Sequence, residues 1–439
     1  MTSRAERVGR KRPWRTVPPP VPGPWNDILD EVQADLGLEL WSLARHARLL
    51  ADALPHEPER LFPLSLGRHV AQRRTEALHE APAGIRSHLR MLMKVSGRRP
   101  PSPLAAAEAC EAIAEWAQEH GFPKTSVRYA EAAAALVPGT AYFTFIAGRT
   151  NRLVGDGWRA DAFYSRAIRA AYRQQDWDVY VRAHLGAGRL NQDEGRLRRA
   201  ANHYFSAARV ALDQGHDWLA AQTYHDIFPL HYQLGNKPKA YATAEKALQT
   251  YPQHHERFPV AVHDYLLLLI LDLHFAEAWP LLEALAGVPL RSPDQVLVWG
   301  TVARTAGHLG LWERYGEAEA KVLSMAPHYE GFAAPAYLGL AAGAHALGEF
   351  ALAMTYAKKS LGFGKLKGDR HVKTLAAELI QALRTGKQAP APAPPLTAEQ
   401  AKALSVLTRR IQAELATWRS APTWTAKENQ SGLWTLGLV

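Results

Sequence analysis

The chain has 439 residues, of which 47% are hydrophobic and 21% charged, so it can bury a large core and is neither disordered nor of low complexity. Its net charge is +10, and its single cysteine excludes an intramolecular disulfide and a zinc site made of cysteines, which suits a reducing cytoplasm. The longest aliphatic run, Leu266 to Leu271, is far shorter than the roughly 20 apolar residues that cross a bilayer. We therefore expect a cytoplasmic protein without a membrane partner.

Residues 1–24 are predicted to be a disordered tail that is basic and rich in proline. Six basic side chains and one acid give this segment half of the net charge, and prolines between Pro18 and Pro24 prevent it from joining a helix. Such an arm can keep a chain soluble, or it can bind nucleic acid by neutralising phosphates. The first interpretation is favoured because basic runs of this kind are common. In the second, the nucleic-acid contacts would be Arg7, Arg10, Lys11, Arg12 and Arg15.

From residue 25 onward the pattern is helical. Apolar residues recur at spacings of three and four over residues 25–55 and 64–96, which predicts an N-terminal helical region over residues 25–100. A cluster of prolines ends this region, and residues 104–120 and 122–137 follow as a helix pair. Alternating apolar and polar runs rich in valine, isoleucine and threonine are scarce, so the predicted fold class is all-α.

Small residues then recur with a regular period. The anchors of this period are Ala160, Ala200, Ala240, Ala278, Tyr315 and Ala353, which are 40, 40, 38, 37 and 38 residues apart. Gly148 and Gly188 precede the first two anchors by twelve residues, and Tyr164 and Tyr204 follow them by four. Each repeat is therefore expected to hold two helices with a small residue on each, so that the pair packs closely.

This order of small residue, alanine, aromatic residue and alanine resembles the tetratricopeptide repeat. The resemblance is clearest over residues 141–365, with a weaker unit at 104–138. The tetratricopeptide unit has about 34 residues, whereas this period is longer, as in bacterial regulatory proteins that include peptide-sensing regulators and the sensor arms of some transcription activators. The resemblance implies a TPR-like α-solenoid of stacked antiparallel helix pairs over residues 104–385, with a concave groove.

The C-terminal part divides into a closing helix, a linker, a further helix and a tail. Residues 369–385 have an apolar stripe and Asp369 as a candidate N-cap, so they are expected to close the repeat array. Residues 386–396 form a proline and alanine linker that should be extended and semi-rigid. Residues 397–419 are expected to be a helix opened by a capping box of Thr397 and Gln400. Residues 420–439 form a tail that contains Trp424 and Trp434 and has no strong helical pattern.

The resemblance also implies that the first helix of each pair lines a peptide-binding groove. Counted from the repeat anchors, the groove positions hold Arg149, Arg152, Arg189, Gln192, His225, Tyr232 and Arg304. The planar fork of arginine suits carboxylates, so a row of arginines favours an acidic peptide or protein as ligand. The competing interpretation is that each arginine is a solvated surface group. The lysine and asparagine set with which chaperone-binding members of the family hold a peptide terminus is not found here.

No catalytic, cofactor or metal motif occurs in the sequence. Gly362, Gly364 and Gly368 fit neither a P-loop nor a dinucleotide fingerprint, and GxSxG and HExxH are both missing. Cys110 lies amid alanines and is interpreted as a small core residue. We therefore expect a non-enzymatic protein-binding scaffold or sensor without a cofactor. The alternative is a regulator whose basic N-terminal region contacts nucleic acid while the repeats sense a ligand, although no helix-turn-helix pattern supports it. No pattern specifies an oligomeric state.

Overall fold

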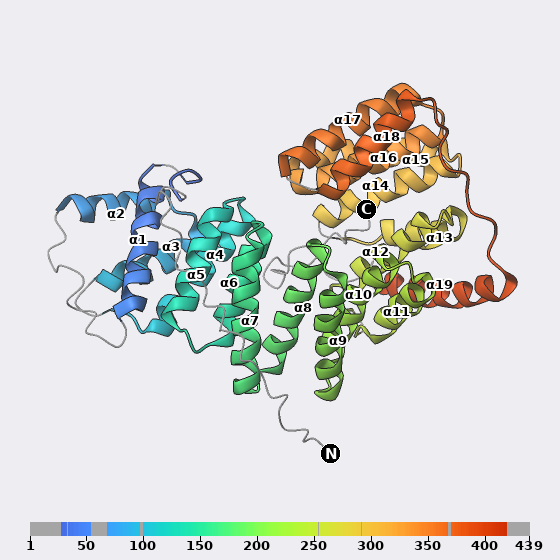
Figure 1. Cartoon of the computed structure of the whole chain (residues 1–439). Helices are drawn as coiled ribbons and strands as arrows, with labels where there is room; N and C mark the ends of the chain where they lie inside the picture. Colours follow the sequence, from blue (N-terminus) through green and yellow to red (C-terminus); the bar gives the residue numbers. More distant parts are fainter. Residues whose placement is uncertain are drawn as a thin grey trace, which may run out of the picture. The chain divides into compact units, whose positions relative to one another are not determined.

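The computed structural model describes residues 28–32, 34–53, 68–96, 100–252, 254–290, 292–367 and 370–418. Within these ranges the chain consists of helices joined by turns and loops, and no strand occurs among them (Figure 1). The prediction of an all-α fold is confirmed. No helix in the described part is long and apolar enough to cross a membrane. The predicted tail 1–24, the N-cap candidate Asp369 and the tail 420–439 lie outside the described residues.

The chain divides into two compact units, Met1–Leu219 and Ala220–Val439, and the boundary falls inside α10 (Asp217–Gln233). In unit 1, three helices precede a series of antiparallel pairs. Its helices before α10 are α1 (Ala34–Ala53), α2 (Arg68–Glu80), α3 (Ala83–Met93), α4 (Pro103–Glu119), α5 (Pro123–Leu136), α6 (Ala141–Leu153), α7 (Gly157–Gln174), α8 (Trp177–Asp193) and α9 (Leu197–Asp213). Helix α1 packs on α5, and α3 packs on α4, so the first three helices share the core of the pairs.

The turn inside each pair has a recurring design. Gly155 ends α6 with a φ of 84°, and Gly195 ends α8 with a φ of 71°, in the left-handed region that glycine adopts without steric cost. In the first of these turns Asp156 caps α7, because its side chain accepts a hydrogen bond from the Arg159 amide at 3.1 Å. These signals are local, so each helix boundary is specified close to where it occurs.

The two helices of a pair meet at the small residues that define the period. A Cβ placed on Gly148 would lie 2.9 Å from the Tyr164 ring, and one placed on Gly188 would lie 2.4 Å from the Tyr204 ring. Both glycines are therefore needed for the close approach of first and second helix. All five alanine anchors have an exposed fraction of 0%, and Tyr315 has 4%. The structure confirms that the predicted anchors lie at the helix contacts.

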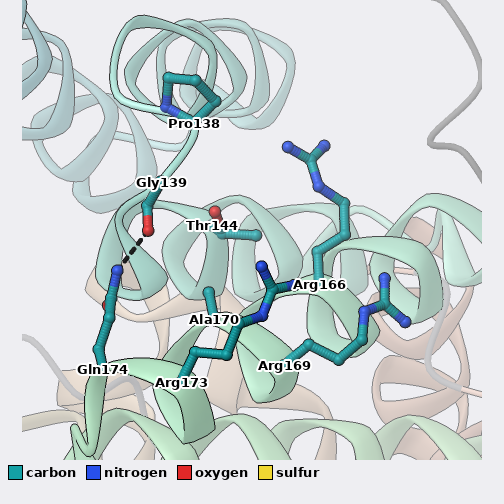
Figure 2. Close-up of a pocket in the computed structure, with 8 residues that line it drawn as sticks. All are labelled: Pro138, Gly139, Thr144, Arg166, Arg169, Ala170, Arg173 and Gln174. Atoms are coloured by element: carbon teal, nitrogen blue, oxygen red, sulfur yellow. Dashed lines mark hydrogen bonds between the residues drawn. The ribbon is translucent and has the colours of Figure 1, made fainter.

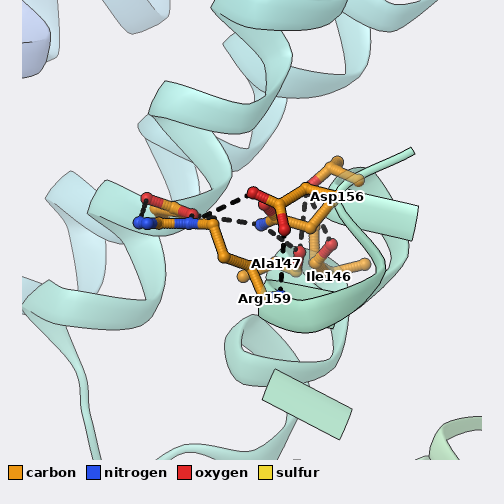
Figure 3. A network of polar contacts seen from close by, with 7 residues as sticks. Ile146, Ala147, Asp156 and Arg159 are labelled. Carbon is orange, nitrogen blue, oxygen red and sulfur yellow. Dashed lines mark hydrogen bonds and ion pairs between the residues drawn. The ribbon is translucent and has the colours of Figure 1, made fainter. Parts of the chain in front are cut away.

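A buried polar network joins three successive helices of unit 1 (Figure 3). The Arg159 guanidinium on α7 donates through Nε and Nη2 to the two carboxylate oxygens of Glu131 on α5, at 2.9 and 3.0 Å. Asn151 on α6 donates from Nδ2 to Glu131 Oε1 at 3.1 Å and to the Ala147 carbonyl at 2.9 Å. The network fixes α5, α6 and α7 relative to one another.

Unit 2 continues the series of pairs and ends with two further helices. After α10 its helices are α11 (Lys237–Thr250), α12 (Phe258–Leu271), α13 (Phe275–Ala286), α14 (Ser292–His308), α15 (Trp312–Met325), α16 (Glu330–Ala346), α17 (Phe350–Lys367), α18 (Arg370–Arg384) and α19 (Ala398–Trp418). First helices stack on first helices, with α14 against both α12 and α16. A Cβ on Gly307 of α14 would lie 2.3 Å from the Gly343 carbonyl oxygen of α16, so glycines allow these two backbones to touch. The helix pairs of each unit form an α-solenoid.

The chain after α17 folds back onto unit 2. Helix α18 packs on α16 and α17 and buries Val372 and Ala376. The linker after it is pinned at two points. His345 on α16 hydrogen-bonds through Nε2 to the Lys387 carbonyl at 2.8 Å, and the Ala393 amide donates to the Leu273 carbonyl at 3.0 Å.

Helix α19 then packs against α13. The predicted capping box is present, because the Thr397 amide donates to Gln400 Oε1 at 3.0 Å and the Gln400 amide donates to Thr397 Oγ1 at 3.3 Å. Gln412 donates from Nε2 to the Pro280 carbonyl of α13 at 3.0 Å. The apolar stripe of α19 joins the core of unit 2 through Leu407, Ile411, Leu415 and Trp418.

Candidate functional site

The predicted groove positions of unit 1 lie on the first helices α6 and α8, which contact each other. Arg149 directly follows Gly148, and Arg189 directly follows Gly188, so the close contact of each glycine with a tyrosine sets the direction of each arginine. Both arginines are half-buried. We call Arg149, Arg152, Arg189 and Gln192 the first-helix surface.

Tyr164 shows how close together the arginines of the first-helix surface are. Burial raises the pKa of the Tyr164 phenol, and the charges of Arg152, Arg189 and Arg149 oppose that rise, as does a hydrogen bond with Arg152. All three guanidinium groups therefore lie within electrostatic reach of one hydroxyl. Although α6 and α8 are forty residues apart in the sequence, the structure brings these three predicted arginines together.

Neighbouring polar groups contact the first-helix surface. Arg152 donates from Nη1 to Asp193 at 2.9 Å, and the Asp193 side chain is 59% exposed. Gln192 accepts a hydrogen bond from the Tyr204 hydroxyl at 2.8 Å. Arg149 acts electrostatically on Glu111, whose pKa is raised by burial against the effect of that arginine, and Arg149 Nε is buried without a hydrogen-bond partner. Arg152 and Arg149 thus each interact with one acid.

His225 does not lie where the sequence interpretation expected it. Its exposed fraction is only 4%, and both ring nitrogens are engaged. Nε2 bonds to Asp264 at 2.7 Å, and Nδ1 lies 3.1 Å from the Tyr251 hydroxyl. The ring also stacks on Phe228 at 5.6 Å. The expectation that His225 extends a polar ligand surface is corrected, because Asp264 and Tyr251 on neighbouring segments draw the imidazole into the core.

Tyr232 and Arg304 lie close to each other in unit 2, but their polar groups are turned to the protein. The Tyr232 hydroxyl donates to Asp272 at 2.8 Å, and burial followed by this hydrogen bond raises its pKa. Burial lowers the pKa of Arg304 to about 10, and the nearby Tyr232 opposes that effect. Both residues are half-buried, and the Tyr232 hydroxyl is already used in the hydrogen bond with Asp272.

A pocket of about 390 Å³ lies between α7 and the N-terminal part of α6 in unit 1 (Figure 2), and none of the four residues of the first-helix surface lines it. Arg166, Arg169 and Arg173 of α7 line one side of it, and the turn at Pro138 and Gly139 lines another. The sequence interpretation missed these arginines because it counted only first-helix positions. The signal was present, since spacings of three and four place the three side chains on one face of a helix.

The described residues include no cluster that could hold a metal ion, and their cysteine is buried. No group of three or more histidine, cysteine, aspartate or glutamate side chains among them could hold a metal ion. Cys110 is fully buried on α4, and burial raises the pKa of its thiol. A buried thiol with a raised pKa is a poor nucleophile. The interpretation of Cys110 as a core residue is confirmed.

Helix pairs follow one another with a regular period and meet at glycine, alanine and tyrosine contacts. The chain has the architecture of a tetratricopeptide-like repeat protein. No family model matches the sequence, and no curated protein is significantly similar to it.

Several solved structures resemble the chain in fold. One is the Rap conjugation gene regulator of the plasmid pLS20 in complex with the Phr* peptide, with 15% identity, 86% of this chain and 98% of that chain covered, and a TM-score of 0.43. A Rap protein complexed with competence and sporulation factor has 10% identity, 80% and 98% coverage and a TM-score of 0.36. A signal transduction ATPase with a tetratricopeptide repeat sensor from Pyrococcus horikoshii has 12% identity, 90% and 63% coverage and a TM-score of 0.39.

Proposed function

We propose that this chain is a non-enzymatic scaffold or sensor that binds an acidic peptide or protein segment on the first-helix surface. The observation that carries the proposal is the gathering of Arg149, Arg152 and Arg189 around the hydroxyl of Tyr164. Positive groups held this close together on packed helices create a field that favours a carboxylate-rich ligand.

The three arginines have different parts in this proposal. The side chain of Arg152 is only 7% exposed and is bonded to Asp193, so it acts through its charge and holds the neighbouring helix in place. Arg149 and Arg189 are half-buried, and their forks are the groups that would contact a ligand carboxylate in bidentate fashion. Because both side chains are already half-buried, part of their conformational freedom is lost before a ligand binds.

Charge reversal on the first helices tests the proposal. Acidic and neutral peptide arrays are screened with the wild type and with the double variant Arg149→Glu/Arg189→Glu. We expect the acidic hits to weaken by at least about tenfold, the loss of one charge-assisted contact, while the helical circular dichroism is retained. Arg198→Glu/Arg199→Glu on α9 is the matched control, because both residues are exposed and lie on a second helix. Unchanged acidic hits in the first variant would show that the ligand binds elsewhere.

The regulator alternative rests on the charge of residues 1–24, which comes from the sequence. In that case deletion of residues 1–24 weakens binding to duplex DNA. The affinity of the full chain should then fall with salt, with a log–log slope of about −0.9 for each phosphate that is neutralised. A full chain that fails to bind DNA at low salt removes this alternative.

A further inference from the structure

The outer face of α7 carries an arginine row that the first-helix proposal does not use. Arg166, Arg169 and Arg173 follow one another at spacings of three and four, and Figure 2 shows them side by side along the helix. Tyr164 and Ala167 lie on the inner side of the same helix, where they are buried. The arginine row therefore lies on a different face of α7 from Tyr164 and Ala167.

The opposite wall of the pocket is held in place by hydrogen bonds. Gln174, at the end of α7, donates from Nε2 to the Gly139 carbonyl, and the Ala141 amide donates to Gln174 Oε1 at 3.3 Å. Thr144 Oγ1 donates to the Thr140 carbonyl at 3.0 Å. The turn before α6 is thus tied to the C-terminal end of α7, and the pocket between them is formed before any ligand arrives.

The charge of the pocket is not balanced by its own lining. None of the residues that line it is acidic. Burial lowers the pKa of Arg166, and the positive charges of Arg169 and Arg48 on α1 lower it further. The charges of Arg166 and Arg169 are close enough to repel each other, and an anion held between them would lessen that repulsion. The amino end of α6 adds a smaller positive potential from its backbone amides.

We propose that this pocket binds the phosphate groups of a small anionic molecule. Guanidinium forks pair with phosphate oxygens in bidentate fashion, and three of them on one helix match a ligand with several negative oxygens. A volume of about 390 Å³ is that of a small-molecule site. A diphosphate carries enough negative oxygens to pair with all three arginines at once.

The repeat architecture does not itself require this arginine row. The positions forty residues later, on α9, hold Ser206, Arg209 and Asp213. Helix α9 packs in the same manner as α7, although these three positions hold one arginine, one acid and one hydroxyl group. The row on α7 is therefore an addition to the packing pattern, and it lies on the other side of α7 from Tyr164 and the first-helix surface.

Isothermal titration calorimetry with inorganic pyrophosphate at low ionic strength tests the proposal. The wild type is compared with Arg166→Gln/Arg173→Gln and with the control Arg198→Gln/Arg199→Gln, which removes the same charge from exposed positions of α9. We expect binding by the wild type and by the control, and at least a tenfold loss of affinity in Arg166→Gln/Arg173→Gln. Thermal unfolding without ligand shows whether the pocket variant is still folded. Removal of like charges should not lower its melting temperature, so a loss of affinity can be assigned to the pocket.

Three outcomes would overturn the proposal: no heat of binding in the wild type, an equal loss in the control variant, or equal affinity for citrate, which carries similar charge on carboxylates. Failure here leaves the peptide screen on Arg149 and Arg189 unaffected, since the two sites share no residue.

Discussion

At the scale of single residues, the buried pair of Glu131 and Arg159 is the most consequential interaction in unit 1. Both residues are 8% exposed, and their bidentate contact is shared with Asn151. A buried ion pair contributes little when compared with an apolar replacement, but it is costly to break, because one charge then remains in the core without its partner.

We predict that Glu131→Gln lowers the free energy of unfolding by about 3–5 kcal/mol. The glutamine can still accept from Asn151, but the buried Arg159 guanidinium keeps only the more distant carboxylate of Asp156, 3.9 Å from its Nε, as a counter-charge. Lys124→Gln is the control, since Lys124 and Asp30 form an ion pair at 3.1 Å with side chains 51% and 55% exposed, and such pairs are worth less than about 1 kcal/mol. Urea denaturation followed by circular dichroism measures both variants. Equal midpoints would contradict the role given to Glu131.

The register of Arg149, Arg152 and Arg189 was predictable, because the glycines at 148 and 188 mark the helix contacts in the sequence. The placement of His225 was not. Its partners Asp264 and Tyr251 lie 39 and 26 residues further along the chain. A hydrogen bond between distant segments cannot be recognised from the repeat period. Counting repeat positions alone therefore assigns such a side chain to the wrong surface.

At the scale of helices and linkers, the return of α19 onto α13 was not predictable from its sequence. The helix itself was, since the capping box and the apolar stripe are local signals. Its docking depends on Gln412 reaching the Pro280 carbonyl and on Ala393 reaching Leu273. Leu273 has a φ of 64° in the α12–α13 turn, where the other pairs of unit 2 have Gly235, Gly310 and Gly348. The linker is thus bonded to an unusual turn.

We predict that Ile411→Asp releases α19 from unit 2. Ile411 is 1% exposed, and a carboxylate in its place would be buried without a partner. Limited proteolysis should then cut the linker 386–396 several times faster than in the wild type, with most of the helical signal retained. Val406→Asp is the control on the exposed side of the same helix, where the valine is 56% exposed. Equal rates of cleavage in the two variants would mean that α19 is not held by its apolar stripe.

At the scale of the whole molecule, both units contain histidines that the fold keeps neutral. Burial lowers the pKa of His184 to about 3, and that of His255 and His308 to about 4. The neighbours His203, Arg257 and Arg304 add to the respective shifts through their positive or ionisable groups. In the unfolded chain these imidazoles would have the ordinary pKa of about 6.5.

We predict that the protein loses stability as the pH falls from 7 to 5. Between pH 7 and pH 5 these histidines are protonated in the unfolded chain but stay neutral in the folded chain. The free energy of unfolding must therefore decrease as the pH falls. For His184, which is 8% exposed, the loss is about 2 kcal/mol between pH 7 and pH 5. Urea midpoints measured at both pH values check this, with His184→Gln/His255→Gln/His308→Gln as the variant that should be less sensitive. A wild-type midpoint that stays constant would contradict it.

The amino-acid sequence by itself determined the helices, their pairing period and the glycine and alanine contacts, because these depend on signals within about forty residues. It also indicated three of the arginines that the fold gathers around Tyr164. Only the tertiary structure decided that His225 is buried, that the arginines of α7 meet the turn at Gly139 in a pocket, and that α19 folds back on α13. Each of these depends on contacts between side chains or backbone groups that a repeat period does not encode, since long-range packing and burial are properties of the assembled helices.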